Sequence, residues 1–222
     1  MFIIQKKGGS YTAGDIQGKT LVYHMLRVGK DDSWEHGEGN TDGSGSFNLS
    51  WLEGFDGSSG STTGTIAVNT SGIVTIIGDS TAQGFMSSDK KTVVLTMGDA
   101  SHGYHLMIMQ ITATEFTAGA LPAGTAYAHM LGIGATTGWI HETTTVAPGG
   151  GMTFSDWVTN NPMFTAPSTT YTGNITTTSG TLTITGNPTF HGQISHDQKI
   201  IVGTQTQGSN PNYVYLLNVV TK

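Results

Sequence analysis

Residues 72–94 read GIVTIIGDSTAQGFMSSDKKTVV, and a stretch of the same pattern, GTLTITGNPTFHGQISHDQKIIV, occupies residues 180–202. The two stretches share glycine and turn-forming polar residues at one constant offset, 180 − 72 = 108. The shared residues are Gly84, Ser87, Asp89 and Lys91 in the first stretch, and Gly192, Ser195, Asp197 and Lys199 in the second. Because Gly, Ser and Asp favour turns, both stretches are predicted to be short strands joined by the same turns.

The repeat extends over most of the chain. Matching segments are 11–14 and 116–119, 24–26 and 129–131, and 34–36 and 139–141, at an offset of 129 − 24 = 105. A unit of this length exceeds the ~20–50 residues of a solenoid repeat. The sequence therefore predicts a small domain duplicated in tandem, with one copy in residues 1–113 and the other in residues 114–222.

Each copy is predicted to be an antiparallel β-meander. Short runs of Val, Ile, Leu, Tyr and Phe alternate with clusters of Gly, Ser, Thr and Asn, which is typical of strands and tight turns. In the first copy we expect strands at residues 20–28, 34–39, 46–53, 64–69, 72–77, 82–87, 92–97 and 104–111. A meander of this many strands tends to close and so remove its edges, which favours two small β-barrels. A β-sandwich and propeller-like blades are the alternative architectures.

Composition limits the partners of the chain. The net charge is −6 with only 9 Lys and Arg among 222 residues, which argues against binding to a nucleic-acid backbone. No run approaches the ~18 apolar residues of a membrane span. Residues 1–7 lack the long apolar region of a signal peptide, so we expect either a cytoplasmic protein or a mature chain without its leader. The Thr/Ser/Gly-rich composition favours an extracellular or periplasmic location.

Asp15-Ile16-Gln17-Gly18 stands before the first expected strand, and an apolar meander follows it. This opening resembles that of bacterial lipocalin-like (calycin-type) barrels. Those barrels usually have Trp just after the Gly, where this chain has Lys19. The resemblance covers the first strand and the general layout of each copy, and it implies a barrel whose interior holds a small molecule.

Gly78-Asp79-Ser80 follows an apolar run and resembles the first motif of the GDS-type esterases and lipases. That resemblance implies Ser80 as a nucleophile, with a His and an Asp from a later DxxH motif. No clear DxxH motif follows Ser80, and the matching residue of the second copy is Pro188. A turn between two strands is the simpler interpretation of this segment.

Histidine and tryptophan recur in both copies and form the main candidate site. Alternation places His24 on the same face as Val22 and Leu26, so we expect that face to point into the domain. Since neighbouring strands lie ~4.8 Å apart, His24 is expected to meet His36. The candidate ligand-binding residues are His24, Trp34 and His36 in the first copy and His129, Trp139 and His141 in the second. Core histidines that only pack under a Trp are one alternative, and a metal site that lacks a third placed ligand is another.

An acidic loop is the candidate metal site. Glu38, Asn40 and Asp42 space oxygen ligands two residues apart before Gly43, as in the first half of a calcium loop. The carboxylate expected six residues after that Gly is missing, because Leu49 occupies the position. A solvated polar hairpin is the alternative, and no other cofactor is expected.

These observations favour a non-enzymatic binding module for a small molecule or a glycan. A structural or surface-assembly β-protein without a ligand is a second hypothesis. A serine esterase that uses Ser80 is a third.

Overall fold

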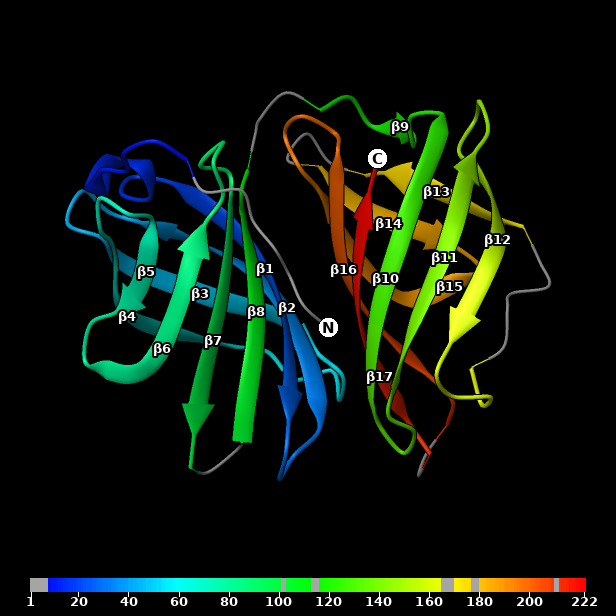
Figure 1. Ribbon diagram of the computed structural model, residues 1–222, viewed down its shortest axis with the longest axis horizontal. Helices are drawn as coiled ribbons and strands as arrows, with labels where there is room; N and C mark the ends of the chain where they lie inside the picture. Colours follow the sequence, from blue (N-terminus) through cyan, green and yellow to red (C-terminus); the bar gives the residue numbers. More distant parts are fainter. Residues whose placement is uncertain (1–7, 101–102, 113–115, 165–169, 177–179, 210–211) are drawn as a thin grey trace. The chain divides into compact units, whose positions relative to one another are not determined.

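The computed structural model describes residues 8–100, 103–112, 116–164, 170–176, 180–209 and 212–222. The chain divides into two compact units, Met1–Thr112 and Ala113–Lys222. Each unit is a closed antiparallel β-barrel (Figure 1). The predicted all-β class and the tandem barrels are therefore confirmed, whereas the sandwich and propeller alternatives are wrong.

In the first barrel each strand pairs with the next, and β8 pairs with β1 to close the meander. The strands are β1 (Thr20–Val28), β2 (Ser33–Thr41), β3 (Ser46–Gly54), β4 (Gly60–Val68), β5 (Ile73–Ile76), β6 (Asp79–Met86), β7 (Thr92–Asp99) and β8 (Gly103–Ile111). They correspond one to one to the strands expected from the sequence, although their ends differ. Closure pairs the edge strands, so the barrel leaves none of them open.

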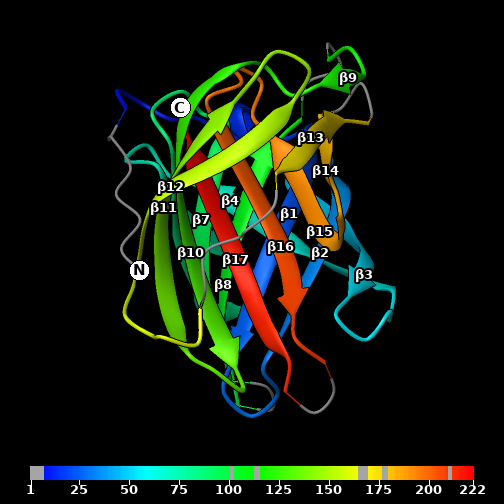
Figure 2. The same cartoon turned by 90° about the vertical axis from the view of Figure 1, so that its right-hand side faces the viewer.

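The second barrel repeats this order from β10 to β17. Its strands are β10 (Gly124–Gly134), β11 (Gly138–Val146), β12 (Gly151–Thr159), β13 (Tyr171–Ile175), β14 (Thr181–Thr185), β15 (Asn187–Ile194), β16 (Ile200–Gln207) and β17 (Val214–Thr221). The short β9 (Gly119–Ala120) adds to β13, and the pairing of β12 with β13 closes the ring. Figure 2 shows β17 between β10 and β16, the neighbours that its backbone pairing gives it.

Strand registers preserve the internal repeat. His24 on β1 lies opposite His36 on β2, and His129 on β10 lies opposite His141 on β11. Residues that match in the sequence repeat therefore also occupy matching positions in the strand pairing of the two barrels. This correspondence allows a position in one lumen to be compared directly with its counterpart in the other.

The shared turn residues perform the same task in both copies. The Ser87 hydroxyl accepts a hydrogen bond from the Thr92 amide at 2.9 Å, and the Ser195 hydroxyl accepts one from the Ile200 amide at 2.9 Å. Each hydroxyl also donates to the aspartate two residues later. The turns between β6 and β7 and between β15 and β16 are therefore held by one side-chain pattern, as the sequence predicts.

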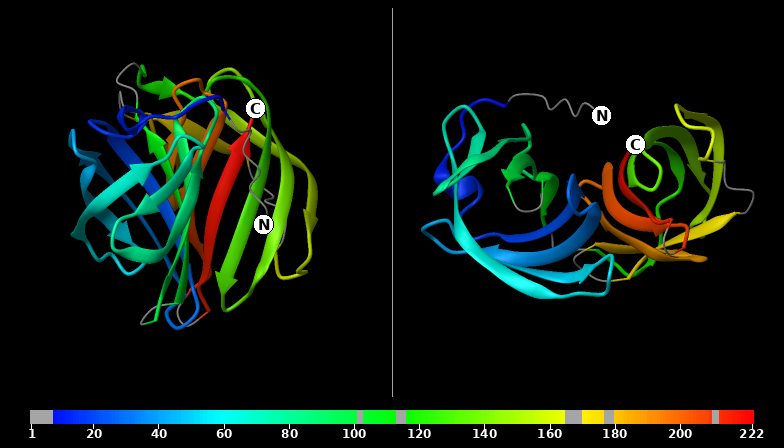
Figure 3. Two further views of the ribbon diagram at one scale, coloured as in Figure 1. Left: turned by 60° about the vertical axis from the view of Figure 1, so that its left-hand side comes forward. Right: turned by 90° about the horizontal axis from the view of Figure 1, so that it is seen from below.

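The segment before β1 closes one end of the first barrel. It contains a 3-10 helical turn, η1 (Ala13–Asp15), and is drawn in dark blue in Figure 3. Tyr11 and Ile16 are buried in the core of this barrel, and the Tyr11 hydroxyl donates to the Met86 carbonyl. Gly72 has a φ of +82°, and a Cβ there would lie 2.7 Å from the Tyr11 ring. The glycine therefore allows the ring to pack against the turn backbone.

Candidate functional site

The lumen of the first barrel contains a cavity of about 460 Å³. Residues from all eight strands line it, so it lies inside the ring of strands. Its apolar wall is formed by Leu21, Met25, Phe47, Leu49, Ile66, Ile76, Leu95, Met97, Met107 and Met109. The exposed Ser61, Thr62 and Thr63 also line it, so the cavity reaches the protein surface beside β4.

A small polar network lies in this apolar lumen. The Tyr23 hydroxyl donates to Glu35 Oε1 at 3.1 Å, and an Arg27 terminal nitrogen lies 3.4 Å from Glu35 Oε2. Arg27 and Glu35 line the cavity directly. His105 on β8 pairs with Arg27 across the β1–β8 ladder and lines the same cavity. The network therefore places cationic and hydrogen-bonding groups beside an apolar space.

Burial controls the ionisation of this network. Burial raises the pKa of Tyr23, and the nearby charge of Glu35 raises it further. Burial also raises the pKa of Glu35, while the Arg27 charge opposes that rise. Tyr23 therefore stays protonated and acts as a hydrogen-bond donor, and Arg27 provides the countercharge for Glu35.

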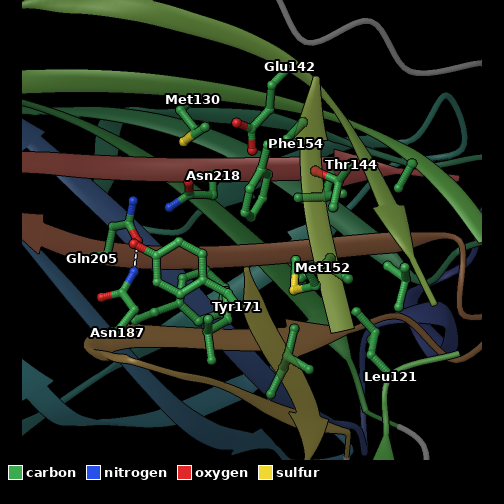
Figure 4. Close-up of a pocket in the computed structure, with 18 of the residues that line it drawn as sticks. Leu121, Met130, Glu142, Thr144, Met152, Phe154, Tyr171, Asn187, Gln205 and Asn218 are labelled. Carbon is green, nitrogen blue, oxygen red and sulfur yellow. Dashed lines mark hydrogen bonds between the residues drawn. The ribbon is translucent and has the colours of Figure 1, made fainter. Parts of the chain in front are cut away.

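The second barrel has a smaller cavity of about 100 Å³. Its walls are mainly aliphatic and aromatic, and Figure 4 shows the side chains that surround it. The Asn187 amide donates to Gln205 Oε1 at 2.6 Å, which satisfies two of the polar groups on the wall. The exposed Gln207 and Lys222 also line the cavity, so it too reaches the surface.

Glu142 on β11 is the buried carboxyl of the second lumen. Its side chain points into the cavity in Figure 4, and the residue is only 4% exposed. Its Oε2 atom has no hydrogen-bond partner among the described residues. Burial raises the pKa of Glu142 to about 7, and a hydrogen bond with Thr144 opposes the rise in part. A partly ionised carboxyl thus faces a mainly apolar space, and none of the described residues forms an ion pair with it.

The predicted histidine and tryptophan residues meet, but on the outer face of the strands. The ring centroids of His24 and His36 are 5.8 Å apart, and those of Trp34 and His36 are 6.0 Å apart. The predicted inward orientation of His24 is wrong, because Leu21, Tyr23 and Met25 of β1 form part of the barrel core instead. Both faces of this strand are apolar, so alternation alone could not identify the inner one.

The second copy follows the same arrangement. The ring centroids of His129 and His141 are 4.7 Å apart, and burial together with the neighbouring His141 lowers the pKa of His129. Trp139 is 42% exposed. Glu142 and Thr144 line the cavity, which places His141 on the outer face of β11. Ligand binding by the two histidine–tryptophan sets stays a prediction.

The candidate calcium ligands lie at the end of β2 and in the turn that follows it. Glu38 and Asn40 are exposed, and Asn40 Oδ1 accepts a hydrogen bond from the Thr20 hydroxyl at 3.0 Å. Asp42 Oδ1 accepts hydrogen bonds from the Ser44 amide, the Ser44 hydroxyl and the Ser46 amide. These hydrogen bonds lower the pKa of Asp42, and the carboxylate shapes its own turn. Calcium binding by the three residues stays a prediction.

Ser80 lies at the start of β6 and is exposed. Asp79 Oδ1 accepts hydrogen bonds from the Thr81 amide and hydroxyl, which is typical of a turn. Within the described residues, the Ser80 hydroxyl makes no hydrogen bond to a histidine. The motif therefore lies where a turn was expected, in an all-β barrel rather than in an α/β fold.

Arg27, Glu35 and Glu142 were not predicted as site residues, because none of them belongs to a recurring pattern. For Arg27 and Glu142 the signal is a single charge on a mainly apolar strand face. Glu142 shares its face of β11 with the buried Ile140 and Val146, for example. An internal carboxylate at such a position predicts a lumen group once the barrel is recognised.

Fold and cavities define the chain as a tandem β-barrel protein with an open lumen in each unit. Comparison with known proteins gives no match to a protein-family model, to a curated protein or to a solved structure. Among the described residues, no helix has the length and apolar character needed to cross a membrane. The chemistry of the two lumens is therefore the main indication of function.

Proposed function

We propose that the chain is a non-enzymatic binding protein whose first barrel holds a small amphipathic molecule in its lumen. The observation that carries this proposal is the cavity of about 460 Å³ with an apolar wall and one polar network. Binding pockets for small molecules commonly have volumes of ~300–1,000 Å³ and a few polar groups on an apolar lining. The cavity of the first barrel falls within this volume range and has such a lining.

The wall fits a ligand with an apolar body. Met25, Met97, Met107 and Met109 line the cavity, and flexible methionine side chains adapt to the shape of an apolar ligand. Burial of an apolar surface contributes about 25 cal/mol per Å² of area removed from water. This wall favours an apolar body over a glycan.

Arg27 supplies a recognition group for the polar end of the ligand. Its Nε atom is buried and has no hydrogen-bond partner among the described residues. A buried donor without a partner costs about 1–3 kcal/mol, and an acceptor on the ligand would remove that cost. The proposed ligand therefore has a hydrogen-bond acceptor, such as a carboxylate or a sulfonate, at one end.

The proposal agrees with the lipocalin-like resemblance of the sequence, which implies a ligand inside the barrel. The closed meander and the segment that packs across one end support that relation. An extracellular or periplasmic location is part of the same proposal and is supported by the Thr/Ser/Gly-rich composition.

Two variants of neighbouring residues on β7 test the proposal. Met97 lines the lumen, whereas Thr96 is exposed on the outer side of the same strand. In isothermal titration calorimetry, anilinonaphthalenesulfonate should bind to the wild type and to Thr96→Trp. Met97→Trp should bind it at least ~10-fold more weakly, because the indole occupies the cavity. Equal affinity in the two variants would place the probe outside the lumen and contradict the proposal.

Ligand chemistry is tested separately with Arg27→Gln. This variant should lose affinity for the sulfonate but keep its affinity for phenylnaphthylamine, a neutral probe with a similar aromatic body. Equal losses for both probes would show that Arg27 does not recognise the polar end.

A further inference from the structure

The second barrel differs from the first in the chemistry of its lumen. Tyr23 lies opposite Gly37 in the first barrel, and Ala128 lies opposite Glu142 at the matching position of the second. At the next inward-facing position along the strands, Met25 lies opposite Glu35 in the first barrel, whereas Met130 lies opposite Ile140 in the second. The duplicated framework therefore carries its lumen carboxyl at a different position in each copy.

The partners of that carboxyl also differ. Glu35 has Arg27 and Tyr23, and the residues that match these two are Gly132 and Ala128. The second lumen thus provides neither the guanidinium nor the phenol at the matching positions. Its carboxyl is 4% exposed and its Oε2 atom has no partner among the described residues, so the unsatisfied group faces the cavity.

Aromatic side chains surround the same space. Glu142 lies opposite a β-bulge in β12, between the pairs His141–Val158 and Thr143–Ser155. Because of the bulge, the extra residues of β12 lie opposite Glu142, and both Phe154 and Trp157 line the cavity. The Phe154 ring contacts the Tyr171 ring edge-on, with centroids 5.8 Å apart.

A carboxyl with aromatic neighbours is a site for a cation. Aromatic faces attract ammonium groups, and the attraction strengthens when the cation is removed from water. A cavity of about 100 Å³ suits a molecule of about five heavy atoms, since an apolar cavity of ~150 Å³ accommodates benzene. We propose that the lumen of the second barrel binds a small primary amine as its ammonium ion, with Glu142 as the counter-ion and Phe154, Trp157 and Tyr171 around it.

This site is independent of the ligand proposed for the first barrel. The other titratable groups that line the cavity with Glu142 are Tyr171 on β13 and Lys222 after β17. The Lys222 ammonium donates to the Pro122 carbonyl at 2.8 Å, so it is held by its own acceptor. Within the described residues, β10, β12, β14, β15 and β16 contribute no charged side chain to the lining.

The ammonium ion needs the carboxylate form of Glu142. Affinity should therefore rise about tenfold per pH unit below the pKa of Glu142 and level off above it. The amine itself stays charged throughout that range, since alkyl amines titrate near the value of lysine, about 10.4. Binding should in turn lower the pKa of Glu142, because an opposite charge favours the ionised carboxyl.

The test compares n-butylamine with n-butanol, which has nearly the same size but no charge. Calorimetry on the full chain at pH 8 should show that butylamine binds more tightly than butanol. Glu142→Gln should weaken butylamine binding at least tenfold and leave butanol binding unchanged. Asp156→Asn, which removes an exposed carboxylate of β12 in the same barrel, should leave both unchanged.

A second measurement needs no variant. With carboxyl-¹³C-labelled glutamate in the wild type, saturating butylamine should lower the NMR-detected pKa of Glu142, and butanol should not. The proposal is overturned if the two ligands have equal effects on this pKa, or if Glu142→Gln binds butylamine as well as the wild type does.

Discussion

Replacement of Glu142 by Gln should change the pH dependence of stability in the second barrel. The carboxyl is 4% exposed, and burial raises its pKa from the ordinary 4.5 to about 7. Below pH 4.5 the group is protonated in both the folded and the unfolded chain. Between these two pKa values only the unfolded chain releases the proton, so the free energy of unfolding falls as the pH rises. Above pH 7 both states are ionised and the loss is complete.

The size of the loss follows from the pKa shift. One pKa unit corresponds to 1.36 kcal/mol, so the difference between 4.5 and about 7 amounts to about 3 kcal/mol. The wild-type barrel should therefore be about 3 kcal/mol less stable at pH 8.5 than at pH 4 through this group alone. Gln cannot ionise, so Glu142→Gln should lack this pH-dependent loss of stability. The free energy of unfolding of the variant should therefore rise relative to that of the wild type as the pH rises.

Urea unfolding monitored by tryptophan fluorescence measures the effect. Trp34 and Trp51 are replaced by Phe, so that Trp139 and Trp157 report on the second barrel alone. Asp156→Asn is the matched control, because Asp156 is an exposed carboxylate of β12 in the same barrel. The control should follow the wild type at every pH. If Glu142→Gln and the wild type show the same pH dependence, Glu142 is not buried as a carboxyl and the reasoning fails.

Three further predictions concern the framework. Ser195→Ala should destabilise the second barrel by about 1–2 kcal/mol in urea unfolding, because the part-buried Ile200 amide loses its acceptor; unchanged stability would show that the repeated turn does not need this hydroxyl. Gly72→Ala should cost about 1–3 kcal/mol, through its positive φ and the contact with Tyr11. Gly78→Ala, with a φ of +90° but open space around a Cβ, should cost less, and equal losses would exclude the ring contact as a cause. If Glu38, Asn40 and Asp42 bind calcium, the melting midpoint should be higher with calcium than with a chelator. Equal midpoints would show that the Asp42 carboxylate only holds its own turn.

The repeat made the architecture predictable. Two copies with matching turn residues specify where strands end, and the Ser87 and Ser195 turns form as their sequences indicate. The pairing of His24 with His36 was also predictable, because strand spacing and a short connection bring the two residues together. These features depend on residues near each other in the sequence.

The lumens depend on residues far apart in the sequence, and this part was not predicted. The strand β1 reads TLVYHMLRV and is apolar on both faces, so its sequence does not show that Tyr23 and Arg27 face inward. The size of each cavity follows from the packing of side chains from eight strands. Glu142 is identified as a site residue by its burial and by the missing partner of its Oε2 atom among the described residues. Both are features of the folded structure and not of the sequence.

Methyl NMR can show whether the first barrel holds a ligand in its lumen. The chain is labelled at the methionine ε-methyl groups, and anilinonaphthalenesulfonate is added. Met25, Met97 and Met107 line the lumen, whereas Met163 belongs to the second unit and is 74% exposed. If the probe occupies the lumen, the three lumen methyl signals should show saturable shifts and the Met163 signal should stay constant. Binding of the probe without any shift of the lumen methyl groups would contradict the proposed function.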